Sequence, residues 1–256
     1  MATISDYAEL ADVAYGAASE VAAPRDWANH GKSEMATGFV RSFQARAFSR
    51  NGEVVFAFAG TKLGQGNGRI GAGDIVTDLA IGVGMNSSQY AMAERFVLEN
   101  RVGAHDSVTL CGHSLGGAIA QILGNRLRLP FVSFNAPGVA IVSRNLGQVA
   151  ETLHNRPFGI PNMGVRMIGS AASALVQPRQ AMQDLRSLFY WVEGVNFRVD
   201  RDPVSMVGVH YGPVRTLGYA GNSLNPVTWH SMAAMRDALA GKAESTMSIA
   251  AVIAAK

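Results

Sequence analysis

The chain has 256 residues, of which 48% are hydrophobic and 16% charged, so it can form one large domain with a sizeable core but is short for two. Its 22 basic and 19 acidic side chains leave a net charge of only +3 with no basic block, which argues against a nucleic-acid partner. The single cysteine, Cys111, excludes an internal disulfide and a cysteine metal cluster.

The first sixty residues predict a helix followed by a strand hairpin. In chain order, the predicted elements are a helix over 6–18, an irregular segment over 27–36 and strands over 39–49 and 53–59. Ser5 fits a helix N-cap, and Asn51-Gly52 is a hairpin turn signal between the two strands. We therefore expect an antiparallel pair of strands at the start of a sheet.

The centre of the chain alternates between helices and short apolar strands. The predicted elements are helices over 74–83, 88–101, 115–127 and 231–240, and strands over 107–111, 131–135 and 195–199. Such alternation is typical of a parallel sheet covered by helices. The sequence thus predicts a single α/β domain over 1–256. Its mostly parallel central sheet would have an antiparallel N-terminal hairpin and helices on both faces.

Two segments do not fit this alternation. Glycines crowd residues 62–74, which we interpret as a mobile flap and candidate lid. Residues 139–190 contain several prolines and small residues, and we interpret them as an insertion and candidate cap. The run 66–71 matches the dinucleotide fingerprint G-x-G-x-x-G, but it lies inside a long loop instead of directly between a strand and a helix. No cofactor is therefore predicted.

The strongest chemical signal is the sequence Gly-His-Ser-Leu-Gly-Gly at 112–117. It fits G-x-S-x-G, and it follows a predicted strand and opens a predicted helix, as a nucleophile elbow requires. In that context the serine hydroxyl stands clear of the sheet, and free N–H groups at the helix start stabilise developing negative charge. Ser114 is the candidate nucleophile. A chance glycine-rich turn is the alternative, and the flanking elements weaken it.

A serine nucleophile needs a base, and a carboxylate that orients the base. In proteins with a nucleophile elbow, these residues follow one another in the chain in the order serine, acid, histidine. His230 lies near the end of the chain and is the candidate base, whereas His154 precedes any suitable acid. Asp200 and Asp202 both follow the predicted strand 195–199. Position favours Asp202 but leaves Asp200 open. This chemistry requires no metal ion.

The oxyanion of such a reaction needs two hydrogen-bond donors. One is expected from the backbone N–H of Leu115, directly after the nucleophile, and the other from the loop after an early strand. Thr61 ends such a strand and offers both a backbone N–H and a hydroxyl. The alternative interpretation of Gly60-Thr61 is a simple strand-ending turn.

Together these motifs resemble the class 3 lipase family, which includes the fungal triacylglycerol lipases. The stretches that carry the likeness are 58–61, 74–82, 112–117 and 196–212, with His230 at the place of the family's last histidine. The resemblance implies the α/β-hydrolase fold and esterase chemistry on acylglycerols or phospholipids. It also favours Asp202 over Asp200 and places the glycine-rich loop after Thr61 in the lid position. Ala59 departs from the family, which usually has a polar residue there, and the spacing from Pro137 to Asp202 is longer than usual.

Three functions remain open from the sequence. The first is a lipase or phospholipase A that works through a Ser-His-Asp triad and an acyl-enzyme. The second is a carboxylesterase or thioesterase for small soluble acyl substrates, and the third is a non-catalytic binding module on a hydrolase scaffold. The N-terminus does not resemble a secretory signal peptide, so we expect synthesis in the cytoplasm. Export by a dedicated secretion system, an inhibitor protein as partner and transient contact with a membrane surface are further expectations.

Overall fold

The computed structural model describes residues 1–16, 23–24, 26–30, 34–35, 43–60, 87–101, 107–140, 193–219 and 221–255. Several sequence predictions lie outside these residues: the candidate lid 62–74, Thr61, the helix over 74–83, His154 and all but the first two residues of the candidate cap 139–190. In the described ranges, no helix is long and apolar enough to cross a membrane.

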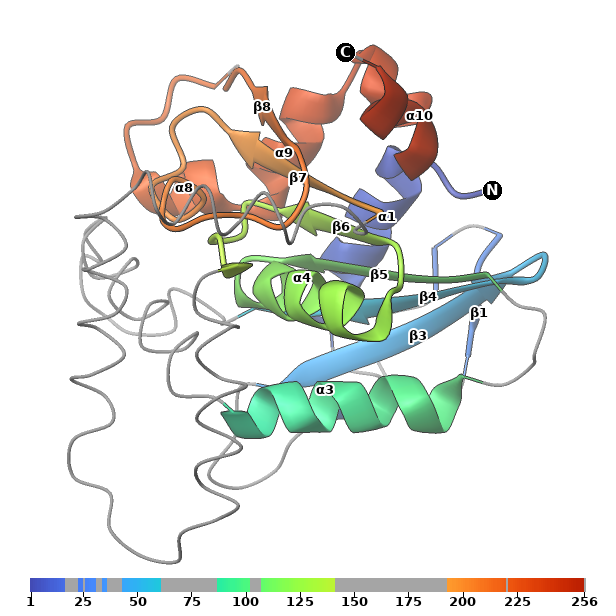
Figure 1. Ribbon diagram of the computed structural model, residues 1–256. Helices are drawn as coiled ribbons and strands as arrows, with labels where there is room; N and C mark the ends of the chain where they lie inside the picture. The colour runs from blue at the N-terminus through green and yellow to red at the C-terminus, as the bar shows by residue number, and fades with distance from the viewer. Residues whose placement is uncertain are drawn as a thin grey trace, which may run out of the picture.

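The described strands form one eight-stranded mixed sheet (Figure 1). They are β1 (Ala28–Asn29), β2 (Glu34–Met35), β3 (Gln44–Arg50), β4 (Glu53–Phe58), β5 (Ser107–His113), β6 (Phe131–Phe134), β7 (Gly194–Val199) and β8 (Val214–Leu217). Their order is β1-β3-β4-β5-β6-β7-β8, and β2 also pairs with β3. β3 and β4 are antiparallel, whereas β4 to β8 run parallel. This confirms the predicted parallel sheet with an antiparallel hairpin at its start.

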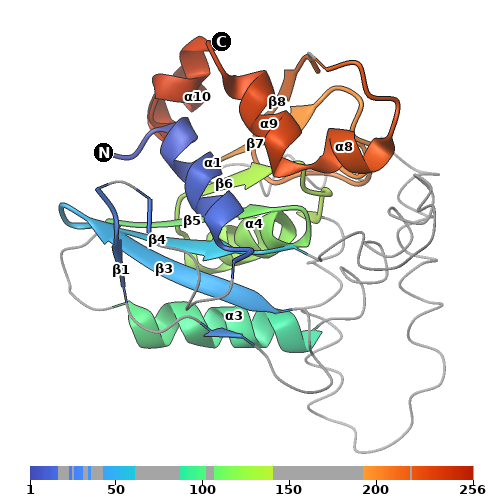
Figure 2. The same cartoon turned by 180° about the vertical axis from the view of Figure 1, so that it is seen from behind.

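Helices cover both faces of the sheet. They are α1 (Ile4–Val13), α3 (Ser87–Asn100), α4 (Leu115–Leu127), α8 (Pro226–His230), α9 (Met232–Leu239) and α10 (Ile249–Ala254), with a 3₁₀ turn at Ala243–Thr246. α4 lies on one face and α1 on the other, as the opposite views in Figures 1 and 2 show. Side chains of β4 alternate between two cores: Phe56 and Phe58 pack with α3 and α4, whereas Val55 and Ala57 pack with α1 and α9.

The first helix begins earlier than predicted. Its N-cap is Thr3, not Ser5, and it ends at Val13 instead of continuing to residue 18. The Thr3 hydroxyl accepts a hydrogen bond from the Asp6 N–H, and the Asp6 carboxylate accepts one from the Thr3 N–H at 2.8 Å. Such a reciprocal capping box needs an acceptor three residues after the cap. Asp6 supplies it for Thr3, whereas Ala8 cannot do so for Ser5.

Other differences concern short elements. The segment predicted as irregular contains β1 and β2, because strands of two residues are too short to show a pattern. β8 was not predicted, because its sequence Val-Arg-Thr-Leu is neither a continuous apolar run, as in β6, nor an alternating one. β5 continues to His113, two residues beyond its predicted end. The predicted last helix over 231–240 is preceded by the separate turn of helix α8, and Ser231 lies between α8 and α9. The catalytic candidate His230 is thus the last residue of α8.

Candidate active site

Ser114 lies on the turn between β5 and α4, at the carboxyl edge of the parallel strands. Its backbone angles, φ 57° and ψ −126°, are strained for a residue with a side chain, at a cost of about 1–3 kcal/mol. The turn also brings α4 very close to β4: a Cβ on Gly116 would lie 2.0 Å from the carbonyl oxygen of Phe58. Only glycine fits there, so the close approach of α4 to β4 at this turn explains the second glycine of G-x-S-x-G.

A continuous chain of hydrogen bonds joins the three predicted catalytic side chains. The Ser114 hydroxyl lies 2.8 Å from Nε2 of His230, and Nδ1 of His230 lies 2.9 Å from Oδ1 of Asp202. All three side chains are buried. Because an ionised carboxylate only accepts hydrogen bonds, Nδ1 of His230 carries the proton and Nε2 is free to accept the serine proton. The geometry suits a general base acting on a serine nucleophile.

The loop after β7 gives its two aspartates different partners. Asp202 is fully buried and accepts hydrogen bonds from the Val204 N–H at 3.1 Å and the Ser205 N–H at 3.2 Å, in addition to its contact with His230. Asp200 instead accepts a hydrogen bond from the Tyr219 N–H at 3.0 Å. The structure therefore brings Asp202, and not Asp200, to the candidate base.

The carbonyl groups at the end of α8 are held by side chains from the strand ends. The last carbonyls of a helix have no partner inside it. Here the Asn135 side-chain amide donates to the Trp229 carbonyl at 3.2 Å, and Nε2 of His113 lies 2.6 Å from the His230 carbonyl oxygen. The Asn135 side chain also accepts a hydrogen bond from the Val199 N–H at 2.9 Å, which links α8 to the end of β7.

Neither Asn135 nor His113 was predicted as a site residue. His113 occupies the free position x of G-x-S-x-G, where the motif demands no residue type. Asn135 follows a four-residue strand, and its one unusual feature is a left-handed backbone angle, φ 44°. The available signals were a polar residue at the end of the predicted strand 131–135, which is Asn135, and one two residues after the predicted strand 107–111, which is His113.

One part of the expected oxyanion site is described. Leu115 is the first residue of α4, so its N–H has no partner within the helix. The end of β4 touches the elbow, because a Cβ on Gly60 would lie 2.7 Å from Cβ of Ser114. Thr61, the predicted second donor, lies outside the described residues.

The loop that carries Asp202 is fixed to the chain after β6. The Gly138 N–H donates to the Val207 carbonyl, and the Ala140 N–H donates to the Val209 carbonyl, both at 2.8 Å.

Nε2 of His210 lies 2.8 Å from the Ala136 carbonyl oxygen, and burial lowers the pKa of His210. The His-Tyr-Gly sequence in this segment thus contributes a structural contact, and the candidate base remains His230.

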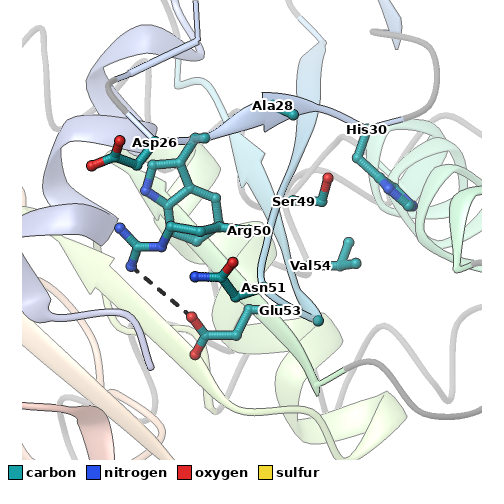
Figure 3. A pocket seen from close by; sticks show the side chains of 10 residues that line it. Asp26, Ala28, His30, Ser49, Arg50, Asn51, Glu53 and Val54 are labelled. Carbon is teal, nitrogen blue, oxygen red and sulfur yellow. Dashed lines mark ion pairs between the residues drawn. The ribbon is translucent and has the colours of Figure 1, made fainter.

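A surface cavity of about 550 Å³ lies at the opposite end of β4, beside the hairpin turn (Figure 3). Its wall includes Trp27, His30 and Glu53. Arg50 lies 4.2 Å from the centre of the Trp27 ring and forms ion pairs with Asp6 at 3.0 Å and Glu53 at 4.0 Å. None of the residues that line it belongs to the Ser114 site, and its arginine is already paired.

The chain is similar to several known proteins. A family model described as "Phospholipase-like: Tle-like phospholipase domain" matches residues 6–155. "Putative lipase ATG15" of Vanderwaltozyma polyspora is 35% identical over 75 residues, which are 28% of this chain but only 12% of that protein. The Lip2 lipase of Yarrowia lipolytica has a TM-score of 0.44 at 13% identity and covers 89% of this chain and 81% of its own. Carboxyl esterase 2 of Tuber melanosporum has a TM-score of 0.35 at 15% identity, over 79% and 80% of the two chains.

The family match confirms the lipase-like character that the motifs indicated. The matched residues 6–155 are more than half of the chain and include the elbow around Ser114. The chain belongs to the family of Tle-like phospholipase domains.

Proposed function

We propose that this lipase-type hydrolase cleaves carboxylic ester bonds of lipids, phospholipids foremost, with Ser114 as nucleophile, His230 as base and Asp202 as the residue that orients the base. The observation that carries the proposal is the buried hydrogen-bond chain of 2.8 Å and 2.9 Å between these side chains. Their order in the chain, serine then acid then histidine, is that of α/β-hydrolases.

The mechanism follows from the protonation pattern of this chain of hydrogen bonds. Oγ of Ser114 attacks the ester carbonyl carbon while Nε2 of His230 takes the hydroxyl proton, and Asp202 stabilises the resulting imidazolium. The backbone N–H of Leu115 and a donor at Thr61 stabilise the oxyanion. The imidazolium then gives its proton to the departing alcohol, which leaves an acyl group on Ser114. Water, deprotonated by His230, releases the acid and restores the serine.

Two features support a lipid as substrate. The family description and the name of the yeast relative both refer to lipid hydrolysis. In addition, the two segments that supply Asp202 and His230 expose large apolar side chains, Met206 and Val207 in one and Leu224 in the other. Leu224 is 81% exposed and lies six residues before His230. Exposed apolar side chains on the segments that supply the site suit contact with the surface of a lipid aggregate.

The test compares wild type with Ser114→Ala on a phospholipid dispersion, a triacylglycerol dispersion and a short-chain soluble ester. Ser245→Ala is the matched control, because Ser245 is also buried but its hydroxyl bonds to the Lys242 carbonyl, away from Ser114. We expect fatty-acid release from the phospholipid that Ser114→Ala abolishes and Ser245→Ala retains. Turnover of the soluble ester alone would make the protein a carboxylesterase or thioesterase. Absence of serine-dependent turnover on all three substrates, together with no labelling by a serine-reactive phosphonate, would indicate the binding module.

A further inference from the structure

The partly buried Tyr15 and the buried His113 form a pair that the mechanism above does not use. Tyr15 follows the end of α1, and His113 is the last residue of β5. The Tyr15 hydroxyl lies 2.6 Å from Nδ1 of His113, and Nε2 of His113 lies 2.6 Å from the backbone carbonyl oxygen of His230. We propose that Tyr15 and His113 are positioning residues that fix the backbone of the catalytic base. The inference rests on the proposed function, because it takes His230 as that base.

The protonation of His113 follows from its partners. A carbonyl oxygen has no proton to give, so Nε2 of His113 must carry the hydrogen and donate it to His230. Nδ1 of the neutral ring is then an acceptor, and the Tyr15 hydroxyl donates to it. The Tyr15 oxygen in turn accepts a hydrogen bond from the Gly60 backbone. One directed series of hydrogen bonds therefore runs from the end of β4, through Tyr15 and His113, to the carbonyl of His230.

His113 stays neutral in this series. Burial, and then the nearby His230, lower the pKa of His113 to about 3. Neutrality matters for the reaction, because the ring of His230 lies only 4.8 Å from that of His113, centre to centre, and becomes positively charged when it takes the serine proton. A second positive ring at that distance would oppose this step. The two histidines thus have opposite tautomers, Nε2–H in His113 and Nδ1–H in His230.

The base needs this support because α8 is short. It has five residues and ends at His230, so few internal hydrogen bonds hold it and its final carbonyls lack helical partners. The imidazole of His230 can move only as far as its backbone allows. A displacement of about 1 Å in a reacting group can lower a rate about a hundredfold. Contacts to the last carbonyl therefore control the distance between Nε2 and the Ser114 hydroxyl.

The first test is steady-state hydrolysis of a soluble ester by single variants. Tyr15→Phe removes one hydroxyl, His113→Leu removes both ring nitrogens, and His113→Gln keeps an N–H donor for the His230 carbonyl. Tyr7→Phe is the matched control, because Tyr7 is a buried tyrosine of α1 whose hydroxyl bonds instead to Thr109. We expect kcat to fall about tenfold in Tyr15→Phe and about a hundredfold in His113→Leu, with KM nearly unchanged.

The control variants complete this test. His113→Gln is expected to recover most of the kcat lost in His113→Leu, and Tyr7→Phe to keep the wild-type value. A wild-type kcat in Tyr15→Phe and His113→Leu overturns the inference, and so does an equal loss in Tyr7→Phe. A wild type without Ser114-dependent turnover is a failure of the proposed function instead.

The second test reads the hydrogen bonds without any turnover. In protein labelled with ¹⁵N-histidine, the ring nitrogen shifts report which nitrogen carries hydrogen. We expect His113 as the Nε2–H tautomer and His230 as the Nδ1–H tautomer at neutral pH, with the Nδ1 signal of His113 shifted in Tyr15→Phe and unchanged in Tyr7→Phe. A protonated Nδ1 in His113 overturns the inference even if the enzyme is active.

Discussion

Oδ1 of Asp202 lies 2.9 Å from Nδ1 of His230, although 28 residues separate the two in the chain. The contact forms because β7 and β8 are adjacent and parallel, so the loop after β7 and the segment after β8 begin at the same edge of the sheet. Asp200, two residues before Asp202, bonds to the backbone of Tyr219 and does not reach the imidazole in this way. The same loop thus offers a test residue and a matched control.

Replacement of Asp202 by asparagine should lower kcat about 10⁴-fold. The amide would present a donor or a weak acceptor to Nδ1 and favour the tautomer of His230 that cannot accept the serine proton. Asp200→Asn should leave kcat within a few-fold of wild type, because it changes one hydrogen bond to Tyr219. Both values come from steady-state hydrolysis of a soluble ester, and equal activities for the two variants would contradict this assignment.

Loss of the Asn135 side chain should affect both activity and stability. Asn135 is buried, and its removal leaves the Trp229 carbonyl and the Val199 N–H without their partner, at about 1–3 kcal/mol of unfolding free energy. Asn135→Ala and Asn135→Gly should lower kcat similarly. The glycine variant should be more stable by about 1 kcal/mol, because φ is 44° at this position. Urea unfolding and ester hydrolysis measure the two effects, and full activity in either variant would count against the role of Asn135.

Stability should decrease as the pH falls below 6.5, in part because of His113. The pKa of His113 is about 3 in the folded protein and 6.5 in the unfolded chain. The unfolded chain therefore binds a proton that the folded chain excludes. The stability from the neutral ring is complete above pH 6.5 and is lost toward pH 3. Between pH 7 and pH 5, wild type should lose about 2 kcal/mol more than His113→Gln. Denaturant unfolding at the two pH values measures this difference, and parallel losses would argue that His113 is accessible to protons.

The exposed apolar side chains on the segments that supply Asp202 and His230 should matter for lipid aggregates only. Leu224→Ser combined with Met206→Ser should reduce hydrolysis of a phospholipid dispersion several-fold and leave kcat on a soluble ester unchanged. Leu98→Ser is the control, because Leu98 is 56% exposed but lies on α3. A similar effect of all these variants on the dispersion, or an effect on the soluble ester, would contradict a specific surface contact.

The sequence could predict features whose residues lie close together in the chain or belong to a motif, and could not predict other contacts that join residues far apart. α4 has the predicted bounds, Leu115–Leu127, because the elbow and the apolar helix are local patterns. The choice between Asp200 and Asp202 needed the geometry of a loop, which spacing alone does not contain. The Tyr15–His113 contact joins residues 98 apart and has no local signal. Export and an inhibitor protein stay predictions.

The proposed function depends on the activation of the Ser114 nucleophile by His230. Its most direct test is incubation with a serine-reactive phosphonate, followed by mass spectrometry of the peptides, for wild type and His230→Ala. We expect one label per chain on Ser114 in the wild type, and labelling slowed by orders of magnitude in His230→Ala. A wild type that remains unlabelled, or carries its label on another residue such as Ser205, would contradict the claim.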